Sequence, residues 1–176
     1  IITLMKPIRI AINGFGRIGR TAFKIALSNP QLEVVAINDI SSIEVLAHLL
    51  RYDTAYGPFA KTVKETANGL HIDGRDIAVF AEKDPSQLPW KKLNVDVVLE
   101  STGRFVKDGA AHAHIDAGAR GVVISAPVKG AGDIPTFIMG VNSDDLKGHP
   151  MVSNASCTTN CVAPVTKIML DQFGIA

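Results

Sequence analysis

The sequence has few cysteines, almost no net charge and no long apolar run. It has 2 cysteines among 176 residues, and 18 Lys and Arg against 17 Asp and Glu, for a net charge of +1. Two cysteines cannot form the disulfide framework of a small secreted domain. Balanced charge gives no electrostatic reason to bind nucleic acid or an anionic membrane, and no apolar run reaches the roughly 18 residues that span a bilayer. We therefore expect a cytoplasmic protein whose partners include neither nucleic acid nor membrane.

The composition is otherwise that of a globular protein. Hydrophobic residues make up 47% of the chain and charged residues 20%, which excludes intrinsic disorder as the general state. A chain of this length corresponds to one domain, or to one domain and the start of another.

The first third of the chain alternates between strand and helix patterns. We predict a strand over 8–13, a helix over 17–27, a strand over 32–37, and a helix that Ser41 or Ser42 caps and that runs to about Leu50. Glu44, three residues after Ser41, fits a capping box. A β-α-β-α order predicts a parallel sheet with right-handed crossovers.

The alternation of strand and helix patterns is interrupted by a segment of short strands and then resumes. Short strand-like runs within 62–80, separated by Asn68-Gly69 and Gly74-Arg75, predict antiparallel hairpins. Beyond them we predict strands over 95–99, 121–125 and 136–141, and helices over 106–117 and 157–173, the last with Pro164 causing a kink or a later start. The predicted fold class is α/β, a Rossmann-type doubly wound, mainly parallel sheet with a small antiparallel insertion.

A glycine motif joins the first predicted strand to the first predicted helix. Residues 14–19 read Gly-Phe-Gly-Arg-Ile-Gly, which fits G-x-G-x-x-G. In that setting Gly14 permits the tight turn, Gly16 lets the backbone approach a pyrophosphate, and Gly19 lets helix and strand pack closely. The free N–H groups and the positive end of the helix dipole then face the phosphates.

An acidic residue stands where a dinucleotide site needs one. Asp39 directly follows the second predicted strand, 20 residues after Gly19, and its carboxylate could accept hydrogen bonds from the adenine ribose. The alternative is a glycine turn that only packs, with Asp39 capping the strand. The context of strand, glycine turn, helix and acid favours dinucleotide binding.

A second motif places a cysteine at the start of a helix. Cys157 follows the polar run 153–156 and precedes an apolar helical pattern. A helix N-terminus stabilises a thiolate, and its N–H groups could hold the oxyanion that forms when the thiolate attacks a carbonyl. Since a free cysteine is also a small apolar residue, this argument alone leaves nucleophile and core residue about equally supported.

The second cysteine fits neither a disulfide nor a metal site. Cys161 lies one helical turn after Cys157, and Cβ atoms at that spacing are about 5–6 Å apart, whereas a disulfide needs roughly 3.5–4.5 Å. Two thiols are also too few for a zinc site, which usually has four ligands. We interpret Cys161 as a packing residue and predict no metal.

Together the two motifs resemble the hallmark segments of phosphorylating glyceraldehyde-3-phosphate dehydrogenase, in its N-terminal NAD-binding portion. Further matching segments lie between them in order, and the resemblance covers nearly the whole chain. The matching segments are Ala11–Arg20, Ala36–Asp39, Arg51–Asp53, Glu100–Gly103, Ile124–Pro127, Met139–Asn142 and Ser153–Cys161.

The resemblance implies NAD as cofactor, with glyceraldehyde 3-phosphate and inorganic phosphate as substrates. Cys157 matches the catalytic nucleophile, which forms a thiohemiacetal and then a thioester on the way to 1,3-bisphosphoglycerate. Ser156 and Thr158 match substrate-binding residues. The residues that match cofactor-binding positions are Asn13, Gly14, Gly16, Arg17, Ile18, Gly19, Asp39, Lys83, Thr102, Gly103 and Ser125. The family further implies a homotetramer and a role in glycolysis and gluconeogenesis.

The family's histidine base has no counterpart in this chain. We therefore expect residues 1–153 to form the NAD-binding Rossmann domain, and residues 154–176 to be the nucleophile-bearing segment and helix that lead to a catalytic domain absent from this chain. Of the 5 histidines, His112 and His114 lie on a predicted helix and are interpreted as solvated. We expect the isolated chain to be inactive.

Two other functions remain open on the sequence. One is erythrose-4-phosphate dehydrogenase, a similar enzyme whose substrate is one carbon longer. The other is a truncated module that binds NAD and a partner without turnover.

Overall fold

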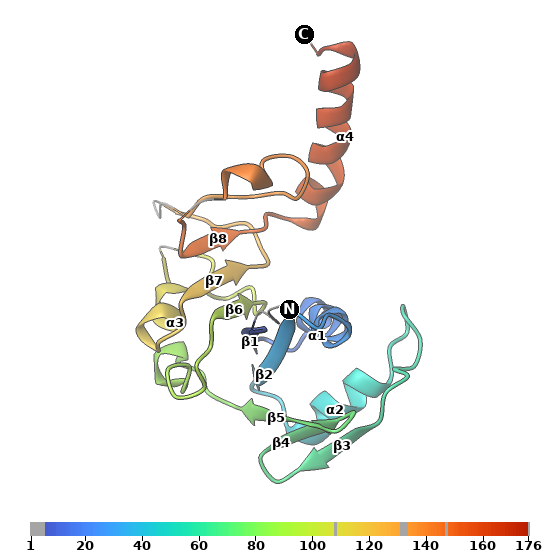
Figure 1. Ribbon diagram of the computed structural model, residues 1–176, viewed down its shortest axis with the longest axis vertical. Coiled ribbons are helices and arrows are strands. Elements are labelled where there is room, and N and C mark those ends of the chain that lie inside the picture. The colour runs from blue at the N-terminus through green and yellow to red at the C-terminus, as the bar shows by residue number, and fades with distance from the viewer. Residues whose placement is uncertain (1–5, 108, 131–133, 147, 176) are drawn as a thin grey trace, which may run out of the picture.

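The computed structural model describes residues 6–107, 109–130, 134–146 and 148–175. An eight-stranded sheet runs through it in the order β3-β4-β5-β2-β1-β6-β7-β8 (Figure 1). The strands are β1 Ile8–Asn13, β2 Leu32–Asn38, β3 Val63–Thr66, β4 Gly69–Ile72, β5 Arg75–Phe80, β6 Val97–Glu100, β7 Gly121–Ile124 and β8 Met151–Ser153. The helices are α1 Arg17–Ser28, α2 Ile43–Arg51, α3 His112–Asp116 and α4 Cys157–Phe173, with 3-10 turns η1 at Pro85–Gln87 and η2 at Ser143–Asp145.

The sheet has a parallel part and an antiparallel part. Strands β5, β2, β1, β6, β7 and β8 run parallel to one another, whereas β3 and β4 form an antiparallel meander that ends on β5. Asp73 and Gly74 make the β4–β5 turn with φ of 52° and 81°, the positive values that a tight hairpin needs. The predicted mainly parallel Rossmann-type sheet with a small antiparallel insertion is confirmed.

Helices cover both faces of the sheet, and each face has its own apolar core. Helices α1 and α2 lie on one face and α3 on the other (Figure 1). The first core includes Ile12, Phe23, Ile37, Leu46 and Leu50. The second includes Ala11, Ala36, Trp90, Val98 and Ile124. Because successive strand residues point to opposite faces, Asn13 continues the face of Ala11, on the α3 side.

The carboxyl ends of the central strands meet at one edge of the sheet. Asn13 at the end of β1 pairs in register with Asn38 of β2 and with Glu100 of β6. The chain fills one side of β1 with β2 and β5 and then crosses to the other side with β6, so the strand order reverses at β1. In open α/β sheets, ligands bind outside the carboxyl ends at such a reversal.

The predicted helix over 106–117 is much shorter in the structure. Helix α3 covers only His112–Asp116. Gly109 has φ of 74°, a left-handed conformation that no α-helix contains, and Lys107 forms an isolated parallel bridge with Lys129. The apolar spacing of this segment reflects packing of a loop and one short helix.

The predicted strand over 136–141 is wrong. Only Thr136 forms a bridge, with Ser153, and Gly140 has φ of 74°. The Asn142 side chain takes backbone hydrogen bonds that a strand would use, since its Oδ1 accepts from Ile138 N at 2.8 Å and its Nδ2 donates to Thr136 O at 3.0 Å. The edge strand is instead β8, which the sequence patterns did not indicate.

The structure decides which serine caps helix α2 and where helix α4 begins. Helix α2 begins after Ser42, whose Oγ accepts from Val45 N, so Ser42 rather than Ser41 is the cap. Helix α4 runs without interruption over Cys157–Phe173 and is followed by Gly174, as predicted, and it contains Pro164. A late start of α4 after that proline is therefore wrong.

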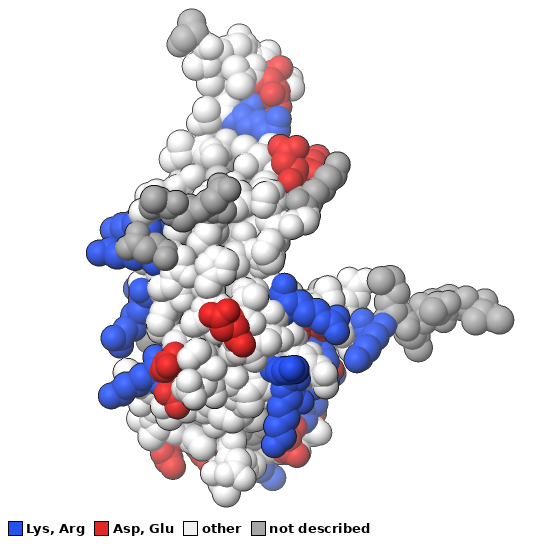
Figure 2. Space-filling model, turned by 90° about the vertical axis from the view of Figure 1, so that its left-hand side faces the viewer, with Lys and Arg blue, Asp and Glu red and all other residues white. Residues whose placement is uncertain are grey.

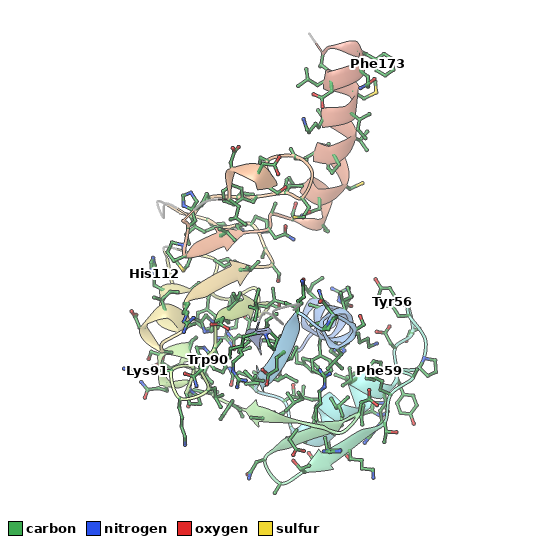
Figure 3. All side chains as sticks on the ribbon, in the orientation of Figure 1. Tyr56, Phe59, Trp90, Lys91, His112 and Phe173 are labelled. Carbon is green, nitrogen blue, oxygen red and sulfur yellow. The ribbon has the colours of Figure 1, made fainter. Side chains whose placement is uncertain are left out.

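Helix α4 extends away from the sheet. It carries no buried residue, and Phe173, 77% exposed, lies at its far end (Figures 1 and 3). On the face drawn in Figure 2, the surface around α4 is mostly uncharged, while Lys and Arg are spread over the lower part. No helix within the described ranges is both long and apolar enough to cross a bilayer.

Candidate functional site

A groove of about 550 Å³ lies at the carboxyl ends of the central strands. Its walls come from the turn after β1, the end of β2, and the loops after β5 and β6. The lining residues are Asn13, Gly14, Gly16, Asn38, Asp39, Ile40, Glu82, Lys83, Ser101, Thr102, Arg104, Phe105 and Ala110. The groove therefore lies where the topology predicts a ligand.

The glycine turn forms the floor of this groove. Gly14 has φ of 90°, and a Cβ there would lie 2.7 Å from Thr102 N, so the β6 loop packs directly on the turn. A Cβ on Gly19 would lie 2.1 Å from Gly14 O, whereas one on Gly16 would meet no atom within 4 Å. Gly14 and Gly19 are thus required for packing, and Gly16 leaves open space in the groove.

The start of helix α1 fits an anionic ligand. Gly16 is its N-cap and makes no side-chain capping hydrogen bond, and the first turn carries no acidic residue. The first N–H groups of a helix have no intrahelical partner, and together with the helix dipole they attract phosphate. The residues present here therefore fit the pyrophosphate of a dinucleotide.

Asp39 is held rigidly beside that helix start. Its Oδ2 accepts from Phe15 N at 2.7 Å and its Oδ1 from Ser41 N at 2.9 Å, and its own N–H donates to Phe80 O at 2.9 Å. The carboxylate therefore ties the glycine turn to the end of β2 while it lines the groove.

The structure brings together only part of the predicted cofactor set. Lining the groove are Asn13, Gly14, Gly16, Asp39, Lys83 and Thr102, whereas Arg17, Ile18, Gly19, Gly103 and Ser125 are not among its lining residues. Arg17 and Ile18 are exposed in the first turn of α1. Ser125 reaches the groove indirectly, through a 3.2 Å hydrogen bond from its Oγ to that of Ser101.

The predicted nucleophile lies away from these central strands, just after the edge strand β8. Cys157 is the first residue of α4 and is exposed. Ser156 caps the helix by accepting from Thr159 N at 3.0 Å, and Ala155 before it has φ of 59°. The N–H groups of Cys157 and Thr158 lack an intrahelical partner, so they are available to an anion next to the thiol.

The neighbours of Cys157 are tied to one another. Ser156 Oγ lies 2.8 Å from Thr158 Oγ1, and Thr158 lines a second hollow, of about 710 Å³, together with Val141 and Lys167. Neither Ser156, Cys157 nor Thr158 lines the first groove. Cys161 is exposed, so its interpretation as a packing residue is wrong, since no residue of α4 is buried in the described part of the chain.

Sequence reasoning missed a buried polar cluster beneath the groove. Glu100, His114 and Trp90 are at most 1% exposed and are joined by hydrogen bonds. The interpretation of His114 as solvated is wrong, whereas His112 is exposed. A carboxylate at the end of the apolar strand β6 was the available signal. Among the described residues, no three His, Cys, Asp or Glu side chains are placed to hold a metal ion.

The chain is similar to known proteins over nearly its whole length. Residues 8–108 match the family model described as glyceraldehyde 3-phosphate dehydrogenase, NAD binding domain. The chain is 52% identical to glyceraldehyde-3-phosphate dehydrogenase of Geobacillus stearothermophilus over 170 residues and 53% identical to that of Kluyveromyces lactis over 169. It is 49% identical to the cytosolic enzyme of Trypanosoma brucei brucei over 168 residues.

These matches cover 96% of this chain and 50% of each relative, so the chain spans about half the length of the curated relatives it matches. Nearly all of the described fold therefore corresponds to half of a longer enzyme in those organisms. The chain belongs to the glyceraldehyde 3-phosphate dehydrogenase family, and residues 8–108 match that family's NAD-binding domain.

Proposed function

We propose that the groove binds NAD through the residues that the sequence predicted. The amides of Gly16, Arg17 and Ile18 would hold the pyrophosphate, since they open an uncapped helix beside open space. The Asp39 carboxylate would accept from the adenine ribose, and Lys83 would lie on the adenine side.

The remaining cofactor contacts come from the neighbouring strands. Thr102 and Gly103 follow β6, and Ser125 follows β7, so we assign them to the nicotinamide half of the groove. Asn13 supports the floor at the end of β1. We further propose that residues 1–153 form the NAD-binding unit and that residues 154–176 lead into the catalytic part of the enzyme. The end of the sheet at Ser153 supports this division.

We propose that the full-length protein oxidises glyceraldehyde 3-phosphate to 1,3-bisphosphoglycerate. The observation that carries this proposal is the exposed thiol of Cys157 at the first position of α4. The N-terminal end of a helix stabilises the thiolate form and developing negative charge on a substrate oxygen. Ser156 and Thr158 would contact the substrate beside the thiol.

The chemistry requires two successive covalent intermediates on Cys157. The Cys157 thiolate adds to the aldehyde carbon, and the oxygen becomes the alkoxide of a thiohemiacetal. NAD, when bound, supplies the acceptor for the hydride that leaves this carbon. The resulting thioester is cleaved by inorganic phosphate, which takes the acyl group and returns the thiol of Cys157.

We extend the family's assembly and location to this protein as proposals. The full-length enzyme would be a homotetramer that works in glycolysis and gluconeogenesis in the cytoplasm. Support for the location comes from relatives named as cytosolic in Trypanosoma and Leishmania.

Matched serine variants of the two cysteines test the catalytic proposal. In the full-length protein, Cys157→Ser should lower NAD reduction with glyceraldehyde 3-phosphate and phosphate by at least about 10³-fold, the scale seen when a nucleophile is removed. Cys161→Ser is the control, because this thiol is also exposed but lies one turn further along the helix, and it should retain activity.

The same assay separates the alternatives. Higher kcat/KM with erythrose 4-phosphate than with glyceraldehyde 3-phosphate would change the substrate assignment. A full-length protein that binds NAD and oxidises neither aldehyde would be a non-catalytic NAD-binding module. Full activity in Cys157→Ser would contradict the nucleophile itself.

A further inference from the structure

A fully buried carboxylate lies behind the groove wall, and no Lys or Arg among the described residues is paired with it. Glu100 Oε2 accepts from Asn13 Nδ2 at 2.6 Å and lies 3.0 Å from His114 Nε2. Its Oε1 accepts from Thr102 N at 2.7 Å and from Thr102 Oγ1 at 2.5 Å. A buried charge is expensive unless hydrogen bonds satisfy it. Here each neighbour can supply a donor, so both oxygens of the Glu100 carboxylate can be satisfied by hydrogen bonds.

The single tryptophan of the chain sets the tautomer of His114. Trp90 Nε1 donates to His114 Nδ1 at 3.0 Å, and an indole N–H is only a donor. Nδ1 must therefore be unprotonated, which leaves the proton of the neutral ring on Nε2, facing Glu100. Asn13 Nδ2 and His114 Nε2 lie 3.3 Å apart because both of these donors converge on the same carboxylate oxygen.

One branch of this network reaches the glycine turn. The two hydrogen bonds to Glu100 Oε1 hold both the backbone and the hydroxyl of Thr102, and Thr102 Oγ1 accepts in turn from Arg104 N at 3.0 Å. Thr102 lines the groove, and its backbone is the surface on which Gly14 packs. Glu100 therefore fixes the distance between the β6 loop and the glycine turn.

The other branch reaches the opposite wall. Asn13 Oδ1 accepts from Asn38 Nδ2 at 2.7 Å. The same Asn38 amide clamps the loop after β5, since it donates to Glu82 O at 2.9 Å and accepts from Glu82 N at 2.8 Å. Glu82 and Lys83 line the groove on that side. A continuous set of hydrogen bonds thus joins both walls to one buried carboxylate.

We propose that Glu100 is a positioning residue for the dinucleotide groove, and that Trp90 makes it one by fixing His114 as a neutral donor. The network fixes both walls before the cofactor arrives, and such preorganisation increases affinity because less order is lost on binding. Neither His114 nor Trp90 lines the groove, so they act through Glu100. The inference rests on the proposed binding of NAD in this groove.

The isosteric change Glu100→Gln tests this role because it keeps the shape of the side chain and changes its charge and its pattern of donors and acceptors. A Gln amide would place a second donor against Asn13 Nδ2 and His114 Nε2–H if its oxygen keeps Thr102. The clash with His114 is relieved only if His114 moves its proton to Nδ1, which the indole N–H of Trp90 forbids, whereas the clash with Asn13 Nδ2 remains in either case. Trp90→Phe removes that N–H while it keeps an aromatic ring, and it should therefore rescue Glu100→Gln in part, by relieving the clash with His114.

The experiment measures NAD affinity by calorimetry and unfolding by denaturant in the full-length protein. We expect Glu100→Gln to raise the dissociation constant about tenfold, which corresponds to about 1.4 kcal/mol. Addition of Trp90→Phe should bring it back to within about threefold of the wild-type value. Glu65→Gln is the matched control, because Glu65 is exposed and pairs with Arg51 away from the groove, and it should leave NAD affinity unchanged.

A spectroscopic measurement tests the same network without any variant of Glu100. In protein labelled with ¹⁵N-histidine, we expect the His114 ring to give the signals of the Nε2–H tautomer, assigned by their loss in His114→Gln. These signals should shift when NAD is added, although His114 does not line the groove. His114→Gln serves for assignment alone, and His112, which is exposed on the same helix, provides a ring whose signals should not shift.

The outcomes separate this inference from the proposed function. Wild-type protein that fails to bind NAD would contradict the groove assignment. Wild-type binding together with an unchanged dissociation constant in folded Glu100→Gln, or an Nδ1–H tautomer of His114, would overturn the positioning role alone. If Glu100→Gln fails to fold, the ¹⁵N-histidine measurement on the wild-type protein is the deciding test. His114 ring signals that do not shift when NAD is added would then overturn the inference.

Discussion

At the scale of single residues, we expect Asp39 to decide between the two nicotinamide cofactors. Both of its oxygens are held by backbone N–H groups, so the carboxylate cannot turn away from a ligand in the groove. The 2′-phosphate of NADP would bring a charge of about −1.5 to −2 beside it. We expect NADP to bind at least about tenfold more weakly than NAD, or about 1.4 kcal/mol, by titration calorimetry at fixed salt.

Asp39→Asn should reduce the difference in affinity between NAD and NADP, because it removes the repulsion between the carboxylate and the 2′-phosphate. Asp73→Asn is the control, since Asp73 pairs with Lys61 in the exposed hairpin and should leave the NADP to NAD ratio unchanged. Equal dissociation constants of the wild-type protein for the two cofactors would contradict the role of Asp39, and would direct attention to Lys83, which lines the same groove.

The residues that the sequence indicated share a property that the missed ones lack. Gly14, Gly16 and Asp39 belong to a local pattern whose spacing follows from one strand, one turn and one helix. The hydrogen bond between Asn13 and Glu100 joins positions 87 apart, and it exists only because β1 and β6 are neighbours in the sheet. No period or motif carries that information, so His114 could not be distinguished from an exposed histidine.

At the scale of elements, the turn between β1 and α1 makes a matched test of two glycines. Gly19→Ala would force a Cβ within 2.1 Å of Gly14 O, so we expect the free energy of unfolding to fall by more than about 2 kcal/mol. Gly16→Ala meets no atom within 4 Å and should leave stability nearly unchanged, while its methyl group should weaken NAD binding by occupying the groove.

Denaturant unfolding and NAD titration check this prediction. Gly19→Ala should lose stability, whereas Gly16→Ala should keep its stability and lose NAD affinity. A stable Gly19→Ala protein would show that α1 can move away from the turn without loss. Wild-type NAD affinity in Gly16→Ala would show that the cofactor does not approach this backbone, and would contradict the proposed pyrophosphate position.

The loop after α2 is expected to loosen in acid. Hydrogen bonds from Tyr56 N–H, then from Lys24, hold the pKa of Asp53 below its ordinary value of 3.8, and the Lys24–Asp53 ion pair ties α1 to this loop at 3.1 Å. A lowered pKa means that the folded state favours the ionised form. This stabilisation is complete above pH 3.8 and disappears as the pH falls through the lower, folded value.

Asp53→Asn should therefore be less stable than the wild-type protein near neutral pH, and the difference should shrink as the pH falls below 3.8. Urea unfolding measured across this range checks the prediction. Asp116→Asn, a change at an exposed aspartate in α3, provides the comparison. A difference between Asp53→Asn and wild type that stays constant with pH would contradict it.

Elements with a strong local signal were predicted well, and elements defined by their neighbours were not. The β1-α1-β2 unit and α4 match their predicted positions because apolar spacing and glycine signals coincide there. The segments around Gly109 and Gly140 break their apolar patterns with left-handed conformations. Strand β8 is only three residues long and is formed by pairing with β7, so its own sequence carries little of the cause.

At the scale of the whole molecule, the two cores form without helix α4. No residue of α4 is buried, and several of its large apolar side chains, such as Val162 and Ile168, are 60% exposed. Apolar surface of this extent usually marks a contact with another protein part. The relatives are about twice as long as this chain, so a helix in the position of α4 has further chain available to it in those enzymes.

The last prediction concerns the 176-residue chain on its own. We expect it to fold, because both faces of its sheet are already covered, and to bind NAD weakly, because the glycine turn and Asp39 lie within it. We expect no meaningful dehydrogenase turnover. Without the family's histidine base, the thiol and the thiohemiacetal lose acid–base assistance, which is typically worth about 10²–10⁴-fold, and the substrate phosphates lose the anchors that orient them for attack.

Two measurements on the purified chain check this expectation. The absorbance of reduced NAD, followed with aldehyde and phosphate, should not rise above the blank. Titration with NAD in an NMR experiment should shift the amide signals of Gly14, Gly16 and Asp39. Robust turnover would mean that one of the described residues replaces the missing base. A folded chain whose amides do not respond to NAD at high concentration would mean that the groove needs the other half of the enzyme to reach its binding form.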